Sequence, residues 1–204
     1  GRRRGRGGGC ARRPRFARGM APEDVEAAIA PDCRASFCES IVSPGAAVVD
    51  LDGSAAVARR HNLPLVVDNT LASPALIRPI EHGADIVWHS TSKFLSGSGQ
   101  TIGGVICDAG RFDWAKAGGY NLITEPWPDY DGLVLTVAFP ETLFAAACRF
   151  FGLRDPRPGL SPMNASLMLM GIQSLPLRML RLCATAHEAA VLCTEPPSRC
   201  SGVS

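Results

Sequence analysis

Four polar side chains lie close enough in the sequence to form one chemical site. Asp68 and Ser90 each follow a short apolar segment, and Ser92 and Lys93 come directly after Ser90. A lysine amine can form a Schiff base with an aldehyde, a carboxylate can keep a ring nitrogen protonated, and hydroxyls can bind a phosphate. Together these groups match what the cofactor pyridoxal phosphate requires.

The segments before these residues are expected to bring them together. Between residues 35 and 90, apolar β-branched runs alternate with helical patterns over short links. They predict strands at 35–41, 64–68 and 84–90 and helices at 53–61 and 74–83. This order favours an α/β fold, a mostly parallel sheet with helices on both faces. In such sheets ligands bind at the carboxyl edge, so Asp68 and Ser90 should meet there.

The rest of the chain is expected to complete this sheet. The segment 101–108 follows Ser90 after about ten residues, too few for a parallel crossover, so it should run antiparallel. Residues 118–132 have no clear period and predict a long surface loop. Further helices are expected at 22–30, 141–153, 161–175 and 176–192, the last two packing their methionines into the core.

Each candidate residue also has an ordinary structural interpretation. An Asp at a strand end often caps a turn, a Ser pair before glycines is typical of turns, and a loop lysine is usually solvated. Ser90 to Lys93 also fits the S-x-x-K motif of acyl-enzyme hydrolases, but the S-D-N and K-T-G segments that the motif needs are missing from the sequence. A phosphate loop ending in Gly-Lys is missing as well.

Composition limits the class of protein. The 204 residues are 46% hydrophobic and 20% charged with a net charge of +2, which is typical of a soluble globular protein without a membrane span. Residues 1–19 hold eight arginines and no acid, and predict a disordered arm for which nucleic-acid binding is not expected. Residues 193–204 predict a disordered tail. The eight cysteines form no C-x-x-C pair, which favours reduced thiols, no metal site and a cytoplasmic protein.

The run from 64 to 114 resembles the Cys/Met-metabolism family of pyridoxal-phosphate enzymes. The segments V-D-N-T and H-S-T-S-K, together with GGVICDAGRFDW, carry the resemblance, which is closest to O-acetylhomoserine sulfhydrylases and extends over about 20–192. It implies that 20–192 is a truncated large domain of the fold type I class. It also implies the site: Lys93 as the lysine that binds the cofactor, Asp68 at the ring nitrogen, Ser90 and Ser92 at the phosphate, and Ser43, where the family usually has Asn, near the substrate.

The resemblance implies a transferase reaction. The acetoxy group of O-acetylhomoserine would be replaced by sulfide or a thiol, giving homocysteine or methionine, in a protein that forms homo-oligomers when complete. The alternatives are a γ-lyase or γ-synthase of the same family acting on cystathionine or methionine, or a remnant without activity that only binds a partner. Because relatives are about twice as long, weak or absent turnover is expected.

Overall fold

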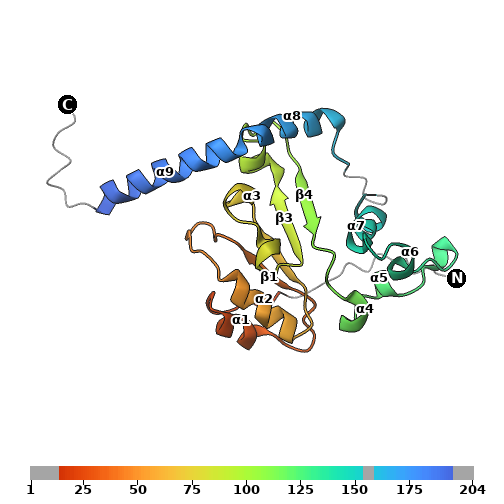
Figure 1. Cartoon of the computed structure of the whole chain (residues 1–204). Coiled ribbons are helices and arrows are strands. Elements are labelled where there is room, and N and C mark those ends of the chain that lie inside the picture. The colour runs from red at the N-terminus through yellow and green to blue at the C-terminus, as the bar shows by residue number, and fades with distance from the viewer. Residues whose placement is uncertain (1–13, 154–158, 195–204) are drawn as a thin grey trace, which may run out of the picture.

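A four-stranded sheet forms the centre of the molecule. The computed structural model describes residues 14–153 and 159–194. The strands lie in the order in which they occur in the sequence: β1 (Ser36–Glu39), β2 (Leu65–Asp68), β3 (Ile86–Ser90) and β4 (Gly104–Asp108) (Figure 1). The first three are parallel and β4 is antiparallel to β3. The predicted α/β fold, its mostly parallel sheet and the reversal of the last strand are confirmed.

The register of the strands places the polar ends at one edge. Asp68 is the last residue of β2 and pairs with Glu39 on one side and Trp88 on the other. Ser90 ends β3 two residues beyond Trp88 and pairs with Gly104 of β4. The carboxyl ends of β1, β2 and β3 therefore share one edge of the sheet, as the alternating pattern predicts.

One face of the sheet is covered by α1 (Pro22–Ala28) and α2 (Leu51–Arg60). The side chain of Asp50 caps α2 by accepting a hydrogen bond from the backbone N–H of Gly53 at 2.9 Å. The apolar residues that this helix and the strands bury against each other form one cluster: Leu51, Ala55, Ala58, Leu65, Val67 and Val87 among them. Burial of this cluster fixes α2 on the sheet.

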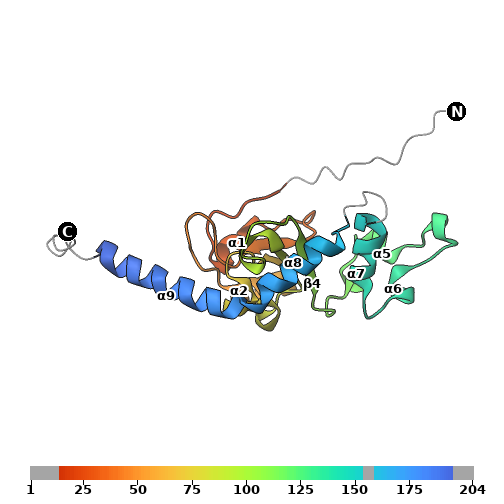
Figure 2. The same ribbon diagram turned by 90° about the horizontal axis from the view of Figure 1, so that it is seen from above.

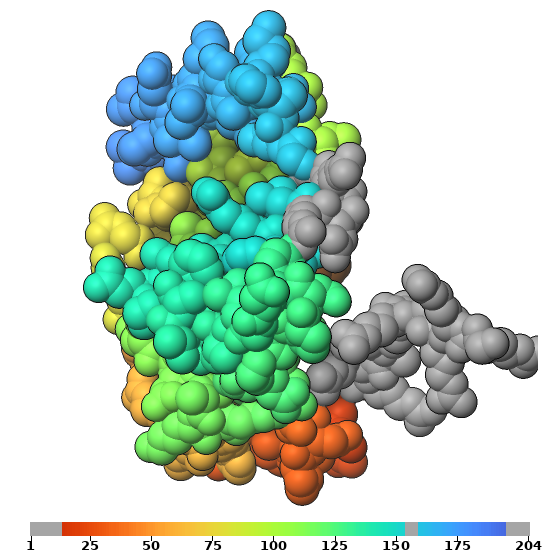
Figure 3. Space-filling model, turned by 90° about the vertical axis from the view of Figure 1, so that its right-hand side faces the viewer, coloured from red at the N-terminus to blue at the C-terminus, as the bar shows by residue number. Residues whose placement is uncertain are grey.

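The opposite face is partly covered, by short helical segments rather than long helices. They are α4 (Trp114–Ala117), α5 (Asn121–Thr124), η3 (Pro128–Tyr130), α6 (Leu135–Ala138), α7 (Leu143–Ala147) and η4 (Cys148–Leu153). Seen from that side, these segments form the middle of the surface, with α8 and α9 above them (Figure 3). Val66 and Ile86 pack against these segments, whereas Phe37, Trp88 and Ile106 on the same face remain 55%, 41% and 51% exposed. The second face is therefore covered only in part.

Two sequence predictions are corrected on this face. Residues 118–132 are not one long loop, because they contain α5 and η3, and Ile123 is buried at 8% exposure. Aromatic packing provides the order that periodicity does not show: the Tyr120 hydroxyl donates to the carbonyl of Arg34 at 2.6 Å, and the Tyr120 ring meets Trp114 edge-on at 4.9 Å. The helix predicted at 141–153 is likewise divided into α7 and the π-helical η4.

The helix predicted at 74–83 is also divided in two. The structure has α3 (Ser73–Leu76) and the 3-10 turn η1 (Pro79–His82) in its place. Pro79 has no N–H to donate and forces Arg78 into an extended backbone conformation, φ −116° and ψ 91°. Gly83 ends the second turn at φ +93°, in the left-handed conformation that glycine tolerates.

The last two helices cross the carboxyl edge of the sheet. Helix α8 (Pro162–Gln173) is followed by α9 (Leu175–Thr194), whose far half extends away from the rest of the molecule (Figures 1 and 2). The prediction that their methionines fill the core is only partly correct. Met168 and Met179 are buried, but Met163 and Met170 are 70% and 64% exposed, because α8 contacts the sheet edge with one side only.

Some sequence predictions fall on residues that the structure does not describe. Most of the expected arm and tail, residues 1–13 and 195–204, lie there, and α9 includes the first two residues expected in the tail. The six cysteines in the described ranges are free thiols. Within the same ranges no single helix has the length and apolar character of a membrane span, although α8 and α9 together, with a 56° bend, would match by length and composition.

Candidate functional site

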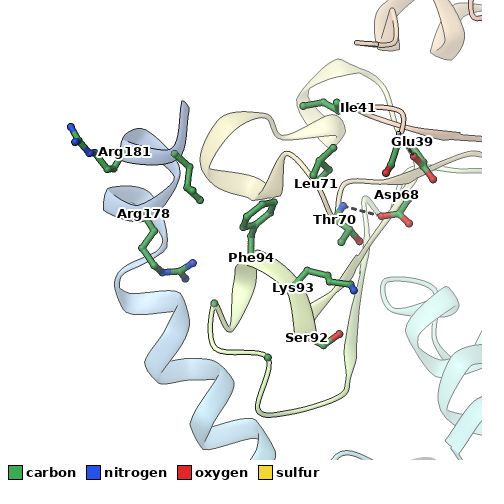
Figure 4. Close-up of a pocket in the computed structure, with 14 residues that line it drawn as sticks. Glu39, Ile41, Asp68, Thr70, Leu71, Ser92, Lys93, Phe94, Arg178 and Arg181 are labelled. Atoms are coloured by element: carbon green, nitrogen blue, oxygen red, sulfur yellow. Dashed lines mark hydrogen bonds between the residues drawn. The ribbon is translucent and has the colours of Figure 1, made fainter. Parts of the chain in front are cut away.

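A cavity of about 910 Å³ opens at the carboxyl edge of the sheet (Figure 4). Its walls come from the ends of β1 and β2, from η2 (Thr91–Leu95) after β3, and from α9. The polar and charged residues that line it are Glu39, Ser43, Asp68, Thr70, Ser92, Lys93, Arg178 and Arg181. Segments separated by more than a hundred residues in the sequence therefore contribute to one site.

Lys93 occupies the centre of the turn that follows β3. Its backbone, at φ −95° and ψ −128°, departs from the helical conformation of the residues around it. The side chain extends into the cavity toward the side where Asp68 and Thr70 lie (Figure 4). The second lysine of the chain, Lys116, is in α4 and does not line this cavity. The amine of the site is therefore supplied by Lys93.

Asp68 lies across the same cavity, and a backbone hydrogen bond fixes its carboxylate. The backbone N–H of Thr70 donates to Asp68 Oδ1 at 2.9 Å. Thr70 Oγ1 in turn accepts a hydrogen bond from the backbone N–H of Ser90 at 2.8 Å. The ends of β2 and β3 are thus joined through one threonine, and the carboxylate and the amine border the same space.

The two predicted phosphate-binding serines are adjacent but not equivalent. Ser92 lines the cavity, whereas Ser90 is not one of the lining residues. Their hydroxyl oxygens are 2.7 Å apart and share a hydrogen bond. Ser90 can therefore orient the Ser92 hydroxyl.

Ser43 reaches the same cavity from the loop after β1. Its backbone N–H donates to Glu39 Oε2 at 2.9 Å. The hydrogen bond fixes the carboxylate of Glu39 beside that of Asp68, since the two residues are register partners in the sheet. The cavity thus has two carboxylates on one wall.

Buried polar residues support Asp68 from inside the sheet. The fully buried Asn69 accepts from the Ser40 hydroxyl at 2.7 Å and donates from Nδ2 to the Ile77 carbonyl at 2.9 Å. Its own carbonyl lies 3.0 Å from His89 Nδ1, and because a carbonyl only accepts, Nδ1 carries the hydrogen. Burial lowers the pKa of His89, although this hydrogen bond and the charge of Asp68 oppose the shift, so the ring is favoured in its neutral form.

The structure brings together most of the residues that the sequence predicts. Ser43, Asp68, Ser92 and Lys93 line one cavity, and Ser90 contacts it through Ser92. The cavity has four further charged or polar lining residues that the sequence motifs do not predict: Glu39, Thr70, Arg178 and Arg181. Thr70 had a local signal, two positions after Asp68, but the arginines reach the site only because α9 crosses the sheet edge.

The donor set of the cavity fits pyridoxal phosphate. A primary amine, a carboxylate and a hydroxyl line a space large enough for one substituted pyridine and its phosphate. The residues that would hold the cofactor are Lys93, Asp68 and Ser92, with Ser90 behind Ser92. All of them lie at the sheet edge where open α/β folds bind ligands.

The sequence of the chain identifies its family. The family model described as "Cys/Met metabolism PLP-dependent enzyme" matches residues 13–198. The chain belongs to this family. Pyridoxal phosphate is therefore the cofactor of the family, as the residues and the resemblance predict.

Relatives within the family agree in sequence and in fold. A sulfhydrylase of Fusarium oxysporum is 45% identical over 178 residues, covering 86% of this chain and 41% of that protein. A homocysteine synthase of Schizosaccharomyces pombe is 42% identical over 178 residues, covering 86% of this chain and 42% of that protein. The chain thus spans about two fifths of the length of the curated relatives that it matches.

A solved structure supports both the fold and the cofactor. It is that of a Campylobacter jejuni protein assigned as an O-acetylhomoserine (thiol)-lyase, which contains N'-pyridoxyl-lysine-5'-monophosphate. The TM-score is 0.80 with 31% sequence identity, over 86% of this chain and 43% of that chain. Over the matched residues the α/β architecture is therefore that of a pyridoxal-phosphate enzyme.

Proposed function

We propose that Lys93 is the residue that binds pyridoxal phosphate in this chain. The observation that supports this most directly is the cavity that Lys93 shares with Asp68 and Ser92. In this proposal the Asp68 carboxylate pairs with the ring nitrogen, and the hydroxyls of Ser92 and Ser90 contribute to the phosphate site. Ser43 lines the same cavity and would lie near the substrate in this proposal.

The proposed reaction is the replacement of the γ-substituent of O-acetylhomoserine by sulfide or a thiol. The names of the relatives, a sulfhydrylase, a homocysteine synthase and an O-acetylhomoserine (thiol)-lyase, support it. The substrate would be a small amino acid, and the product homocysteine or methionine. The γ-lyase and γ-synthase alternatives would use the same cofactor site, so they differ in the substrates taken and the products released.

The residues of the chain have separate tasks in this proposal. The cofactor, when bound, would supply an electron sink for the substrate α-carbon. Lys93 Nζ, once free, takes and returns protons at the substrate. A negative Asp68 favours a protonated ring nitrogen, which keeps the cofactor electron-poor. Thr70 holds that carboxylate in place through its N–H.

Cofactor binding can be tested with a matched pair of lysine variants. The chain is mixed with pyridoxal phosphate, the absorbance of the lysine adduct is recorded, and the adduct is reduced with borohydride and located by mass spectrometry. Wild type and Lys116→Ala should give the band and label Lys93, and Lys93→Ala should give neither. A band of equal size in Lys93→Ala would refute the assignment of Lys93.

Turnover is tested separately, because the chain spans only part of its relatives. O-acetylhomoserine and sulfide are supplied, and homocysteine and α-keto acid are both measured. Homocysteine formation supports the proposed reaction, α-keto acid release supports a γ-lyase, and loss of both with cofactor still bound supports a remnant without activity. The expected result for the chain alone is cofactor binding with weak or absent turnover.

A further inference from the structure

The corner between α8 and α9 contacts the loop that follows Lys93. Arg178, one turn into α9, donates from Nε to Ser174 Oγ at 3.0 Å and from Nη2 to the carbonyl of Gly171 at 2.8 Å. The same Nη2 reaches the carbonyl of Leu95 at 3.4 Å. One guanidinium therefore joins the end of α8, the start of α9 and the residue two positions after Lys93.

Two glycines lie where the corner and the loop meet, one against backbone and one against the Arg178 side chain. A Cβ added to Gly171 in α8 would overlap the carbonyl of Ser96. A Cβ added to Gly97 would lie 2.6 Å from the guanidinium carbon of Arg178, and Gly97 has φ +71° as well. Because neither glycine has a Cβ, Arg178 and the loop can occupy the space beside them.

Further contacts make the loop a defined structure rather than a flexible link. Leu95 is buried with Leu175 and Met179 of α9, and Phe94 packs against them. Inside the turn, the N–H of Gly97 donates to the carbonyl of Lys93 at 2.9 Å. The backbone of Lys93 is therefore fixed by residues that are themselves fixed by α9.

We propose that Arg178 is a positioning residue for Lys93, acting through the 95–97 loop rather than by binding substrate or cofactor. Its Nε and one of its two terminal nitrogens already donate to protein oxygens, although the side chain lines the cavity. A guanidinium with three protein acceptors on two elements suits a fixed geometry. This inference rests on the proposed role of Lys93 as the cofactor-binding residue.

Hydrogen exchange and cofactor binding test the inference together. The variants are Arg178→Gln, which removes the charge and the Nε–H, and Arg178→Lys, which retains the charge. Arg149→Gln serves as the control, because Arg149 is exposed in η4 and does not line the cavity. Exchange is followed at the amides of Ser96 and Gly97 and, as an internal reference, at β2. Affinity for pyridoxal phosphate is measured by titration of its absorbance.

In Arg178→Gln, exchange at Ser96 and Gly97 should accelerate about tenfold, the size expected when a charge-assisted hydrogen bond is lost, with β2 unchanged. Cofactor affinity should fall by a similar factor and be partly restored in Arg178→Lys. Unchanged exchange at Ser96 and Gly97, or equal acceleration in β2, would overturn the positioning role. Faster exchange with unchanged cofactor affinity would overturn the link to Lys93.

The exchange measurement needs no cofactor, so the two proposals can fail separately. If wild type does not bind pyridoxal phosphate, the proposed function fails while the exchange data still show whether Arg178 fixes the loop. If Arg178→Gln does not fold, Arg178→Lys provides the comparison, and wild-type exchange in that variant would contradict the need for a guanidinium.

Discussion

The backbone N–H of Thr70 donates a hydrogen bond of 2.9 Å to the carboxylate of Asp68. The donor is two residues beyond the acceptor, so the chain turns back on itself directly after β2 and leaves the carboxylate at the cavity wall. The same threonine accepts from the N–H of Ser90 through Oγ1. Through Thr70, the position of the Asp68 carboxylate therefore depends on both β2 and β3.

Because the Thr70 N–H needs only an oxygen acceptor, the charge of residue 68 can be removed without removing this hydrogen bond. Asp68→Asn keeps an oxygen that can accept from Thr70, but removes the negative charge. We expect cofactor affinity to fall at least about tenfold, since hydrogen bonds to charged groups contribute about 1.5–3 kcal/mol. Titration of the cofactor absorbance measures this. Thermal unfolding without cofactor is the control and should change little, and an unchanged affinity would contradict the role of Asp68.

The Thr70 hydroxyl can be tested with an isosteric replacement. Thr70→Val retains the shape of the side chain but leaves the Ser90 N–H without its acceptor, so the free energy of unfolding should fall by about 1–3 kcal/mol. Urea denaturation measures the change. Thr70→Ser keeps a hydroxyl and is the matched control, expected to lose less than half as much. A larger loss in Thr70→Ser than in Thr70→Val would show that the methyl group, not the hydroxyl, is responsible.

The sheet and the residues at its ends could be predicted because their signals are local. The apolar run before Asp68 and the ten-residue link after Ser90 determined both strand direction and edge, and the structure agrees. Local sequence patterns did not predict the structure where contacts between distant segments or a single proline determine it. Ile123 is buried by contacts with residues far along the chain, and Pro79 divides a segment whose polarity pattern looked continuous.

The composition of the site shows the same limit. Lys93 and Asp68 could be named from their spacing and their chemistry alone. Arg178 could not, because its place at the cavity depends on the bend between α8 and α9 and on the space left by Gly97. Nothing in the residues next to Arg178 indicates a contact with Leu95, which is 83 positions away.

Asn69 should be a position of large effect on stability. It is fully buried, and its side chain has partners on two segments, the Ser40 hydroxyl and the Ile77 carbonyl. Asn69→Ala leaves both without their partner, which should cost about 2–6 kcal/mol, about one to three for each group. Chemical denaturation measures the loss. The control is Asn121→Ala, an exposed position at the start of α5, where a loss of similar size would show that burial is not the cause.

His89 should make the stability of the protein depend on pH in mildly acidic solution. Burial holds its folded-state pKa below the ordinary value of 6.5. Above pH 6.5 the ring is neutral in both states and contributes no pH dependence. As the pH falls below 6.5, the unfolded chain binds a proton that the folded chain does not, so stability decreases until the folded-state pKa is reached. The slope cannot exceed about 1.4 kcal/mol per pH unit for one group.

Urea denaturation between pH 7.5 and pH 5, compared between variants, isolates this contribution. His89→Gln removes the titrating group while keeping an amide that can donate to the Asn69 carbonyl, so it should lose stability less steeply than wild type as the pH falls. His187→Gln, at an exposed position of α9, should follow the wild-type curve. His61 and His82 keep their carboxylate partners in all three proteins, so any contribution from them cancels in the comparison. Parallel curves for wild type and His89→Gln would show that the buried ring is not responsible for the acid sensitivity.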